Sequence, residues 1–253
     1  MQTSTTTMHS YFKPYLLLIT LLLTAIHYPA EAKTYLVSAG IADYPGEQND
    51  LRLPANDART MVWLYSKNTD VEYYQLLNSS ATKSAIVDAI RNLFSKAAAN
   101  DIVVFFFSGH GYPGGFCAYD DRLSYSEIRR AMASSRSMHK MIFADACFSG
   151  KLREGRTAAS SSAFNAAKRA NVMLFLSSRS NETSIERPDM ENGFFTTYLQ
   201  KGLRGNADAN RDRTITAKEL FNFVSKGVAS LSGGRQHPVM WGKFNDDMPV
   251  MRW

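Results

Sequence analysis

The chain has 253 residues, of which 45% are hydrophobic and 21% are charged, as is usual for globular proteins. The formal net charge is +6, but lysine and arginine are scattered, with no run of five or more. This distribution favours a solvated basic surface and argues against a nucleic-acid-binding face.

The amino terminus has the pattern of a secretory signal peptide. Lys13 precedes the apolar stretch Tyr15–Ile26, and Ala30–Ala32 provides an Ala-x-Ala cleavage site. The apolar stretch is too short to span a bilayer, and no cysteine near the cut suits a lipoprotein anchor. We therefore expect a signal peptide over 1–32 and an exported protein, periplasmic or extracellular in a bacterium, without a stable membrane anchor. The mature chain, 33–253, is long enough for one α/β domain.

Apolar periodicity and turn residues predict alternating strands and helices along the mature chain. In chain order, the expected elements are a strand at 34–39, a helix from Pro54, a strand at 71–77, a helix through Ile86 and Phe94, a strand at 101–107, a short strand or hairpin at 116–119, a helix at 124–132, strands at 140–144 and 171–176, and helices at 194–203 and 217–228. This alternation predicts the α/β class, with a parallel sheet covered by helices on both faces.

Two apolar runs, each followed by a short polar cluster, carry most of the functional information. Ile102–Phe107 precedes Ser-Gly-His-Gly, and Met141–Ala144 precedes Asp-Ala-Cys-Phe-Ser-Gly. Such runs are typical of strands buried in a parallel sheet, whose carboxyl ends lie at one edge. His110 and Cys147 are therefore expected at the same edge, as a thiol nucleophile and its base require.

In this hypothesis Cys147 is the nucleophile, and His110 takes its proton and later protonates the leaving amine. The backbone amides of Gly111 and Cys147 are candidate donors to the oxyanion. No third orienting residue is evident, which favours a dyad. Taken singly, the cysteine could be a packing residue and the histidine a turn residue. The other cysteine, Cys117, could form a disulfide with Cys147, but that would consume the nucleophile, so we expect two free thiols and a buried Cys117.

The two polar clusters resemble those of the caspase-like fold, specifically its metacaspase-type bacterial branch. The resemblance covers nearly all of the mature chain, with supporting similarity at Asn56-Asp57-Ala58, Ser177-Ser178, Glu182-Thr183-Ser184 and Gly193–Thr196. It implies a cysteine endopeptidase with a three-layer sandwich, in which helices flank a mostly parallel central sheet of about six strands. True caspases carry Gln two residues before the cysteine, where this chain has Asp145.

The resemblance also implies a specificity pocket lined by Asp57, Ser108 and Asp145. Two carboxylates would repel an acidic side chain and pair with arginine or lysine. The expected substrates are therefore peptides or proteins cleaved after basic residues. The alternative for Asp57 is a first-turn carboxylate favoured by the helix dipole.

The segment Lys151–Arg169 follows the cysteine where caspase-like proteins carry a linker, which some of them cleave in themselves. Its basic residues would suit a pocket for basic side chains, so self-processing is a hypothesis. A solvated surface loop explains the segment equally well.

The stretch 208–219 resembles an EF-hand loop, with candidate calcium ligands at Asp208, Asn210, Asp212 and Glu219. Arg213, however, occupies the position of the glycine that the sharp turn prefers. The alternative is a structural loop that ends in a capping box at the last helix. We expect no required cofactor, with calcium binding as the less favoured interpretation. The separate aspartate cluster of calcium-activated metacaspases is not well reproduced by Ser124–Glu127 and Glu154.

Two rival functions stay open at this stage. The domain could be a catalytically idle caspase-like binding module, or a calcium-responsive structural protein that works through its 208–219 loop. A hydrolase with a non-peptide substrate is a remoter third. The oligomeric state is not indicated by the sequence.

Overall fold

The computed structural model describes residues 32–147, 172–178 and 187–252. The predicted signal peptide, apart from Ala32, and the segment 151–169 lie outside these residues, as does the side chain of Cys147. Within the described part of the chain, no helix combines the length and apolar character needed to cross a bilayer.

The domain belongs to the α/β class and its main sheet is mostly parallel, as the sequence predicts. Along its path the strands follow the order β2 (Val71–Leu77), β1 (Thr34–Gly40), β3 (Ile102–Tyr112), β6 (His139–Cys147), β7 (Val172–Leu176) and β9 (Val239–Trp241). All neighbours on this path are parallel except β7 and β9. The short strands β4 (Gly115–Cys117) and β5 (Arg122–Ser124) extend from β3 as an antiparallel hairpin, and β8 (Thr214–Thr216) pairs separately with β10 (Pro249–Arg252).

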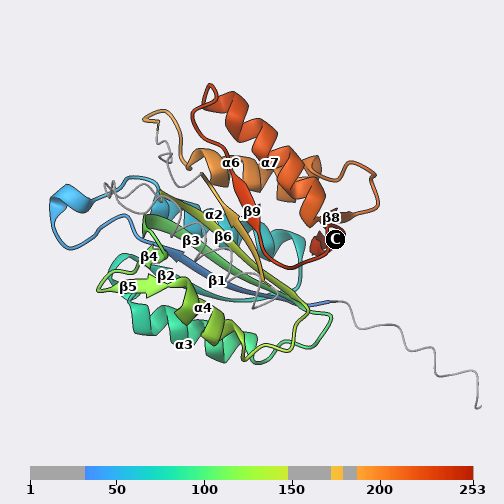
Figure 1. Cartoon of the computed structure of the whole chain (residues 1–253), viewed down its shortest axis with the longest axis horizontal. Helices are drawn as coiled ribbons and strands as arrows, with labels where there is room; N and C mark the ends of the chain where they lie inside the picture. The colour runs from blue at the N-terminus through green and yellow to red at the C-terminus, as the bar shows by residue number, and fades with distance from the viewer. Residues whose placement is uncertain (1–31, 148–171, 179–186, 253) are drawn as a thin grey trace, which may run out of the picture. The chain divides into compact units, whose positions relative to one another are not determined.

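Helices cover both faces of the sheet, which makes three layers (Figure 1). Among the described residues, the α-helices are α2 (Pro54–Asn68), α3 (Lys83–Phe94), α4 (Tyr125–Met132), α6 (Phe194–Lys201) and α7 (Ala217–Leu231). Helices α3 and α4 pack on one face with Phe105 and Phe107, whereas α2, α6 and α7 pack on the other with Val104 and Phe106. The all-apolar run of β3 is thus explained, because successive side chains of one strand enter two different cores.

Local sequence signals account for the starts of several helices. Ser124 and Glu127 form the predicted capping box of α4, with the Ser124 hydroxyl accepting the amide of Glu127 and the carboxylate accepting the amide of Ser124. Thr216 and Glu219 form the same arrangement at α7. Helix α2 begins with Pro54, whose missing amide is not needed at a first helical position.

Three features differ from the sequence-based expectation. Strand β3 does not end at Phe107 but continues to Tyr112, because it pairs with β6 as far as His110 and then with β4. Strands β8, β9 and β10 were not predicted, since three or four residues are too few to show a period. Cys117 is half-buried, whereas a buried side chain was expected.

The carboxyl end of β1 lies unusually close to the start of α2. A Cβ atom on Gly40 would be 2.2 Å from the carbonyl oxygen of Pro54 and 2.7 Å from the Cβ atom of Ala58. Only glycine allows this approach, and it brings the first turn of α2, with Asp57, down onto the carboxyl ends of the strands.

Replacing Gly40 with alanine should therefore push α2 away from the sheet. We expect Gly40→Ala to lower the free energy of unfolding by about 1–3 kcal/mol, which is typical of overpacking in a core. Urea unfolding followed by circular dichroism measures this, with the exposed Gln75→Ala on β2 as a control expected to stay within about 0.5 kcal/mol. An unchanged midpoint for Gly40→Ala would contradict the close packing.

Candidate active site

The predicted catalytic residues lie on neighbouring strands. In the parallel pairing of β3 with β6, His110 is the register partner of Cys147, and Ser108 is the partner of Asp145. Adjacent strands run about 4.8 Å apart, so the backbones at His110 and Cys147 are direct neighbours. The prediction that both residues sit at the same sheet edge agrees with this backbone arrangement.

The imidazole of His110 has a defined hydrogen bond. Its Nε2 atom lies 2.8 Å from the backbone carbonyl oxygen of Asn49, at the end of the short helix η1 (Glu47–Asn49). A carbonyl can only accept, so Nε2 must carry a proton. In the neutral ring Nδ1 is then the unprotonated nitrogen, which is the form that a general base needs.

Tyr44 also holds the histidine. Its ring centroid is 4.9 Å from that of His110, and its hydroxyl accepts the backbone amide of His110 at 3.0 Å while donating to the carbonyl of Cys117 at 3.0 Å. Burial raises the pKa of Tyr44, which keeps the hydroxyl protonated as a donor. A Cβ on Gly109, where φ is +152°, would lie 2.5 Å from this hydroxyl, so glycine is required there.

The loop that carries Tyr44 and Asn49 is tied by side chains to its surroundings. The carboxylate of Asp50 accepts the amide of Tyr44 at 3.0 Å, and the side-chain oxygen of Asn78 accepts the amide of Ala42 at 3.0 Å. Neither Tyr44 nor Asn49 was predicted as part of the site. Tyr44 lies in an ordinary turn sequence. Asn49 contributes a backbone oxygen, which every residue type has, so the sequence cannot indicate it.

Asp57, Ser108 and Asp145, the residues predicted to line a specificity pocket, come together at the carboxyl ends of β3 and β6. Asp57 is buried, with 2% of its surface exposed. One carboxylate oxygen, Oδ2, accepts the Ser108 hydroxyl at 2.8 Å; the other, Oδ1, accepts the side-chain amide of Asn192 at 2.8 Å and the backbone amide of Gly193 at 3.1 Å. Within the described ranges, no lysine or arginine contacts Asp57.

The charge state of Asp57 reflects this burial. Removal from water, followed by the nearby charge of Asp145, raises its pKa to about 8, although the three hydrogen bonds act in the opposite direction. A buried carboxyl with raised pKa and no cation beside it is typical of a functional site, because a structural ion pair would have the opposite shift.

Asp145 is held from α6. Its Oδ2 atom accepts the backbone amide of Thr196 at 3.1 Å and the Thr196 hydroxyl at 2.9 Å. Beside it, the Ser177 hydroxyl accepts the amide of Ala146 at 3.2 Å and donates to the carbonyl of the same residue at 3.1 Å. The backbone between Asp145 and Cys147 is therefore fixed by Ser177. In the sequence, Ser177 and Thr196 contribute only to the resemblance, and neither was predicted to have a role in the site.

Gly111, a predicted oxyanion donor through its amide, opens the antiparallel pairing of β3 with β4, where its register partner is Phe116. This places it one residue after His110 at the strand end. Its role toward an oxyanion, like that of the Cys147 amide, stays a prediction.

The predicted calcium loop adopts a conformation held by its own backbone. The Asp208 carboxylate accepts the amides of Asp212 at 3.2 Å and Arg213 at 3.1 Å, and Glu219 caps α7 through Thr216. Arg213 has φ of +66°, the left-handed conformation in which glycine would be favoured. Over the described residues, no group of three or more His, Cys, Asp or Glu side chains is arranged to hold a metal ion. Calcium binding by Asp208, Asn210, Asp212 and Glu219 stays a prediction.

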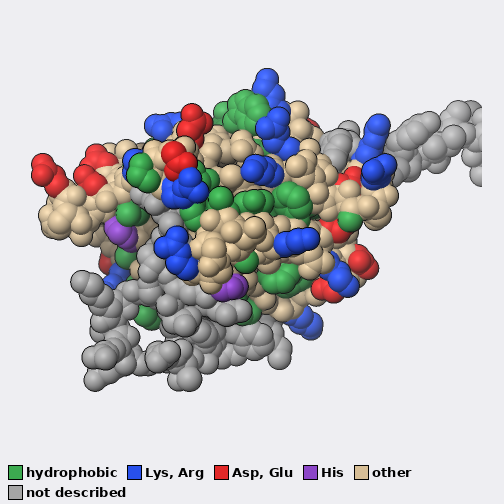
Figure 2. Space-filling view, turned by 90° about the horizontal axis from the view of Figure 1, so that it is seen from above, with side chains coloured by type: hydrophobic (Ala, Val, Ile, Leu, Met, Phe, Trp, Pro, Cys, Tyr) green, Lys and Arg blue, Asp and Glu red, His purple; other side chains and the backbone are tan. Residues whose placement is uncertain are grey.

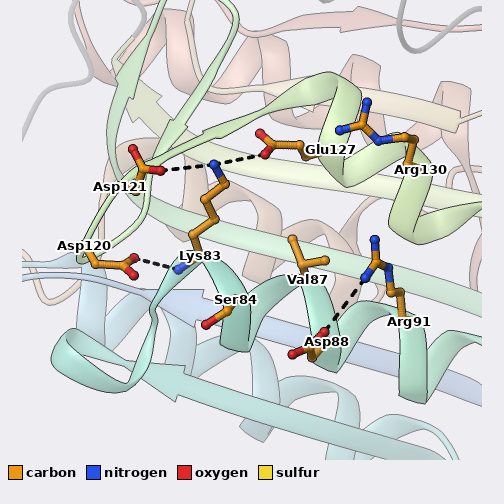
Figure 3. A pocket seen from close by; sticks show the side chains of 9 residues that line it. All are labelled: Lys83, Ser84, Val87, Asp88, Arg91, Asp120, Asp121, Glu127 and Arg130. Carbon is orange, nitrogen blue, oxygen red and sulfur yellow. Dashed lines mark hydrogen bonds and ion pairs between the residues drawn. The ribbon is translucent and has the colours of Figure 1, made fainter.

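A separate pocket of about 470 Å³ lies between α3 and α4 (Figure 3). In it the ammonium of Lys83 is 3.1 Å from Asp121 and 3.0 Å from Glu127, while Arg91 lies beside Asp88. Positive and negative side chains alternate in its lining, and none of the lining residues belongs to the predicted site. On the face in Figure 2, lysine and arginine are likewise spread among acidic residues.

Comparisons with known proteins agree with this arrangement. The family model described as caspase domain matches residues 37–248. The chain belongs to the caspase domain family. The family comprises cysteine peptidases, so membership supports peptidase activity for this chain.

A solved structure supports the fold. The crystal structure of protein GSU0716 from Geobacter sulfurreducens superposes with a TM-score of 0.62 and 17% sequence identity, covering 87% of this chain and 97% of that one. At this identity the likeness concerns the fold alone. No curated protein matches the sequence.

The buried Asp57 should make the stability of this caspase domain depend on pH. The folded state holds the Asp57 proton up to about pH 8, whereas the unfolded chain releases it near pH 4. Stability is therefore lost as pH rises through this interval. Asp57→Asn keeps the shape and removes the charge, so it should raise the thermal midpoint above pH 8 and have least effect below pH 4.

Thermal unfolding of wild type and Asp57→Asn across this pH range measures the difference, with the exposed Asp43→Asn as a control. A difference between wild type and Asp57→Asn that is constant with pH would contradict the raised pKa.

Proposed function

We propose that this protein is a cysteine endopeptidase that cleaves peptide bonds after arginine or lysine. Cys147 is the nucleophile, and His110 is the general base and acid. Asp57, Ser108 and Asp145 receive the basic side chain of the substrate. The observation that carries the proposal is the register pairing of His110 with Cys147 on adjacent parallel strands.

The mechanism follows from the proton positions at His110. Its Nδ1 atom takes the proton of the Cys147 thiol as the sulfur attacks the substrate carbonyl carbon. The resulting tetrahedral oxyanion is stabilised by the backbone amides of Gly111 and Cys147. The imidazolium then protonates the leaving amine, and water hydrolyses the thioester with His110 again as base. Throughout, the Asn49 carbonyl accepts from Nε2 and holds the ring in this orientation.

The specificity assignment is supported by the burial of Asp57 without a cationic partner in the described part of the chain. An arginine or lysine side chain would supply the missing charge, and a guanidinium could form paired hydrogen bonds with carboxylates. An aspartate side chain in the same place would add a third carboxyl to a buried pair, so cleavage after acidic residues is disfavoured.

Cleavage should depend on both catalytic residues and on the charge of the substrate. Wild type should hydrolyse a peptide with arginine before the cleaved bond, while Cys147→Ala and His110→Ala should each lose activity by about 10³-fold or more. Chromatographic product analysis measures this, with citrulline and aspartate peptides as matched substrates expected to be poor. An active Cys147→Ala protein would refute the mechanism, and equal cleavage of arginine and citrulline peptides would refute the specificity.

Tyr44 should act on the rate without touching the substrate. Tyr44→Phe keeps the ring against His110 but removes the bonds to the His110 amide and the Cys117 carbonyl. We expect kcat to fall about tenfold with KM nearly unchanged, because misplacement of a catalytic group lowers the rate of the chemical step. Steady-state kinetics measures both constants, and a change confined to KM would contradict the positioning role.

Several finer features also belong to this proposal. Export through the 1–32 signal peptide, a periplasmic or extracellular location, membership of the metacaspase-type branch and self-processing within 151–169 are consistent with the sequence patterns described above. Calcium is not needed by any step assigned here. The idle binding module stays the main rival, and the comparison of wild type with Cys147→Ala distinguishes it.

A further inference from the structure

A short segment before α6 is fixed to the start of α2. The guanidinium of Arg52 donates to the carbonyls of Arg187 and, at 2.8 Å, of Met190. The side-chain amide of Asn56 donates to the carbonyl of Glu191 at 2.9 Å. These bonds hold the backbone of 187–191 in place just before it reaches the carboxylates of the specificity pocket.

The next residues aim hydrogen-bond donors at both carboxylates. Asn192 and Gly193 donate to Oδ1 of Asp57, and Thr196 donates twice, from its amide and its hydroxyl, to Oδ2 of Asp145. Apart from the Ser108 hydroxyl, the donors that reach Asp57 within the described ranges all come from this segment.

Gly193 lies between the two acids. Its amide donates to Asp57, and a Cβ atom at this position would be only 2.3 Å from Oδ2 of Asp145. Glycine therefore allows the same backbone segment, 192–196, to lie against both carboxyl groups and donate hydrogen bonds to each.

The donors also decide where a proton on Asp57 resides. The side-chain NH2 group of Asn192 and the backbone N–H of Gly193 can only donate, so Oδ1 must stay an acceptor. The Ser108 hydroxyl can donate or accept, so a protonated Asp57 carries its proton on Oδ2 and donates it to Ser108. Among the residues that the structure describes, Asp145 on β6 is the titratable group whose charge acts on Asp57, while Ser108, Asn192 and Gly193 contribute uncharged donors.

We propose that Asn192 and Thr196 are specificity-determining residues, which hold the carboxylates of Asp57 and Asp145 ready for the cationic side chain of a substrate. The inference rests on the peptidase function proposed above. Thr196 favours the ionised form of Asp145 through two hydrogen bonds. Asn192 favours the ionised form of Asp57, which otherwise keeps its proton in the buried site.

Entry of a cation then has a defined proton balance. The guanidinium or ammonium arrives already charged, forms an ion pair with the two carboxylates, and the proton on Oδ2 of Asp57 leaves to the solvent. The Ser108 hydroxyl reverses from acceptor to donor as this happens. Below about pH 8, binding of a basic side chain should therefore release a proton, whereas binding of a neutral analogue should not.

The experiment uses the Cys147→Ala chain, so that binding is measured without turnover. A tetrapeptide amide that ends in arginine and its citrulline counterpart are titrated calorimetrically at about pH 7, in buffers of different ionisation enthalpy. Thr196→Val removes the hydroxyl at nearly constant volume, and Thr196→Ser restores it. Asn192→Ala removes the side-chain donor to Asp57.

We expect the arginine peptide to bind with proton release and the citrulline peptide to bind at least about tenfold more weakly. Thr196→Val should weaken arginine binding by about tenfold or more, with Thr196→Ser close to the parent. Asn192→Ala should shift the pH dependence of binding to higher pH. If Thr196→Val does not fold, this shift alone tests the inference.

Equal binding of the two peptides, or unchanged affinity and pH dependence in both Asn192→Ala and Thr196→Val, would overturn the inference. The proposed peptidase function is tested by a separate outcome. A chain with Cys147 intact that cleaves neither peptide would refute the peptidase, while selective arginine binding with proton release would still support the roles of Asn192 and Thr196.

Discussion

The parallel pairing of β3 with β6 is the constraint on which the candidate site depends. One register sets His110 beside Cys147 and, two residues earlier, Ser108 beside Asp145. A slip by one residue would move every side chain of a strand to the opposite face and separate both pairs. The apolar side chains of the two strands resist such a slip, because they fill distinct cores on the two faces of the sheet. The packing that makes the fold is thus also what assembles the chemistry.

Much of this arrangement could be predicted from the sequence, since it follows from strong local patterns. The apolar run before His110, the capping box at Ser124 and the helical stripe of Ile86 and Phe94 all specify their elements nearly alone. The donors from Asn192 and Thr196 could not be predicted, because they reach Asp57 and Asp145 from segments far along the chain. These contacts form only when α6 packs near α2, so no local sequence pattern indicates them.

The residues predicted to line a specificity pocket include a carboxyl group whose burial opposes its ionisation. Asp57 and Asp145 are both buried, and burial together with the charge of Asp145 raises the pKa of Asp57. The backbone amides of Gly193 and Thr196 donate hydrogen bonds that lessen the cost of ionisation. In the proposed function, a cationic substrate side chain would lower the remaining cost of ionising Asp57.

The bond from His110 to Asn49 has a consequence for how such sites are studied. The acceptor is a peptide carbonyl, so every residue type at position 49 provides it, and alanine scanning would pass over the contact. Only a change in the path of the main chain, such as a deletion between Tyr44 and Asp50, would withdraw the oxygen. In the proposed mechanism, this backbone oxygen therefore takes the place of a third side chain.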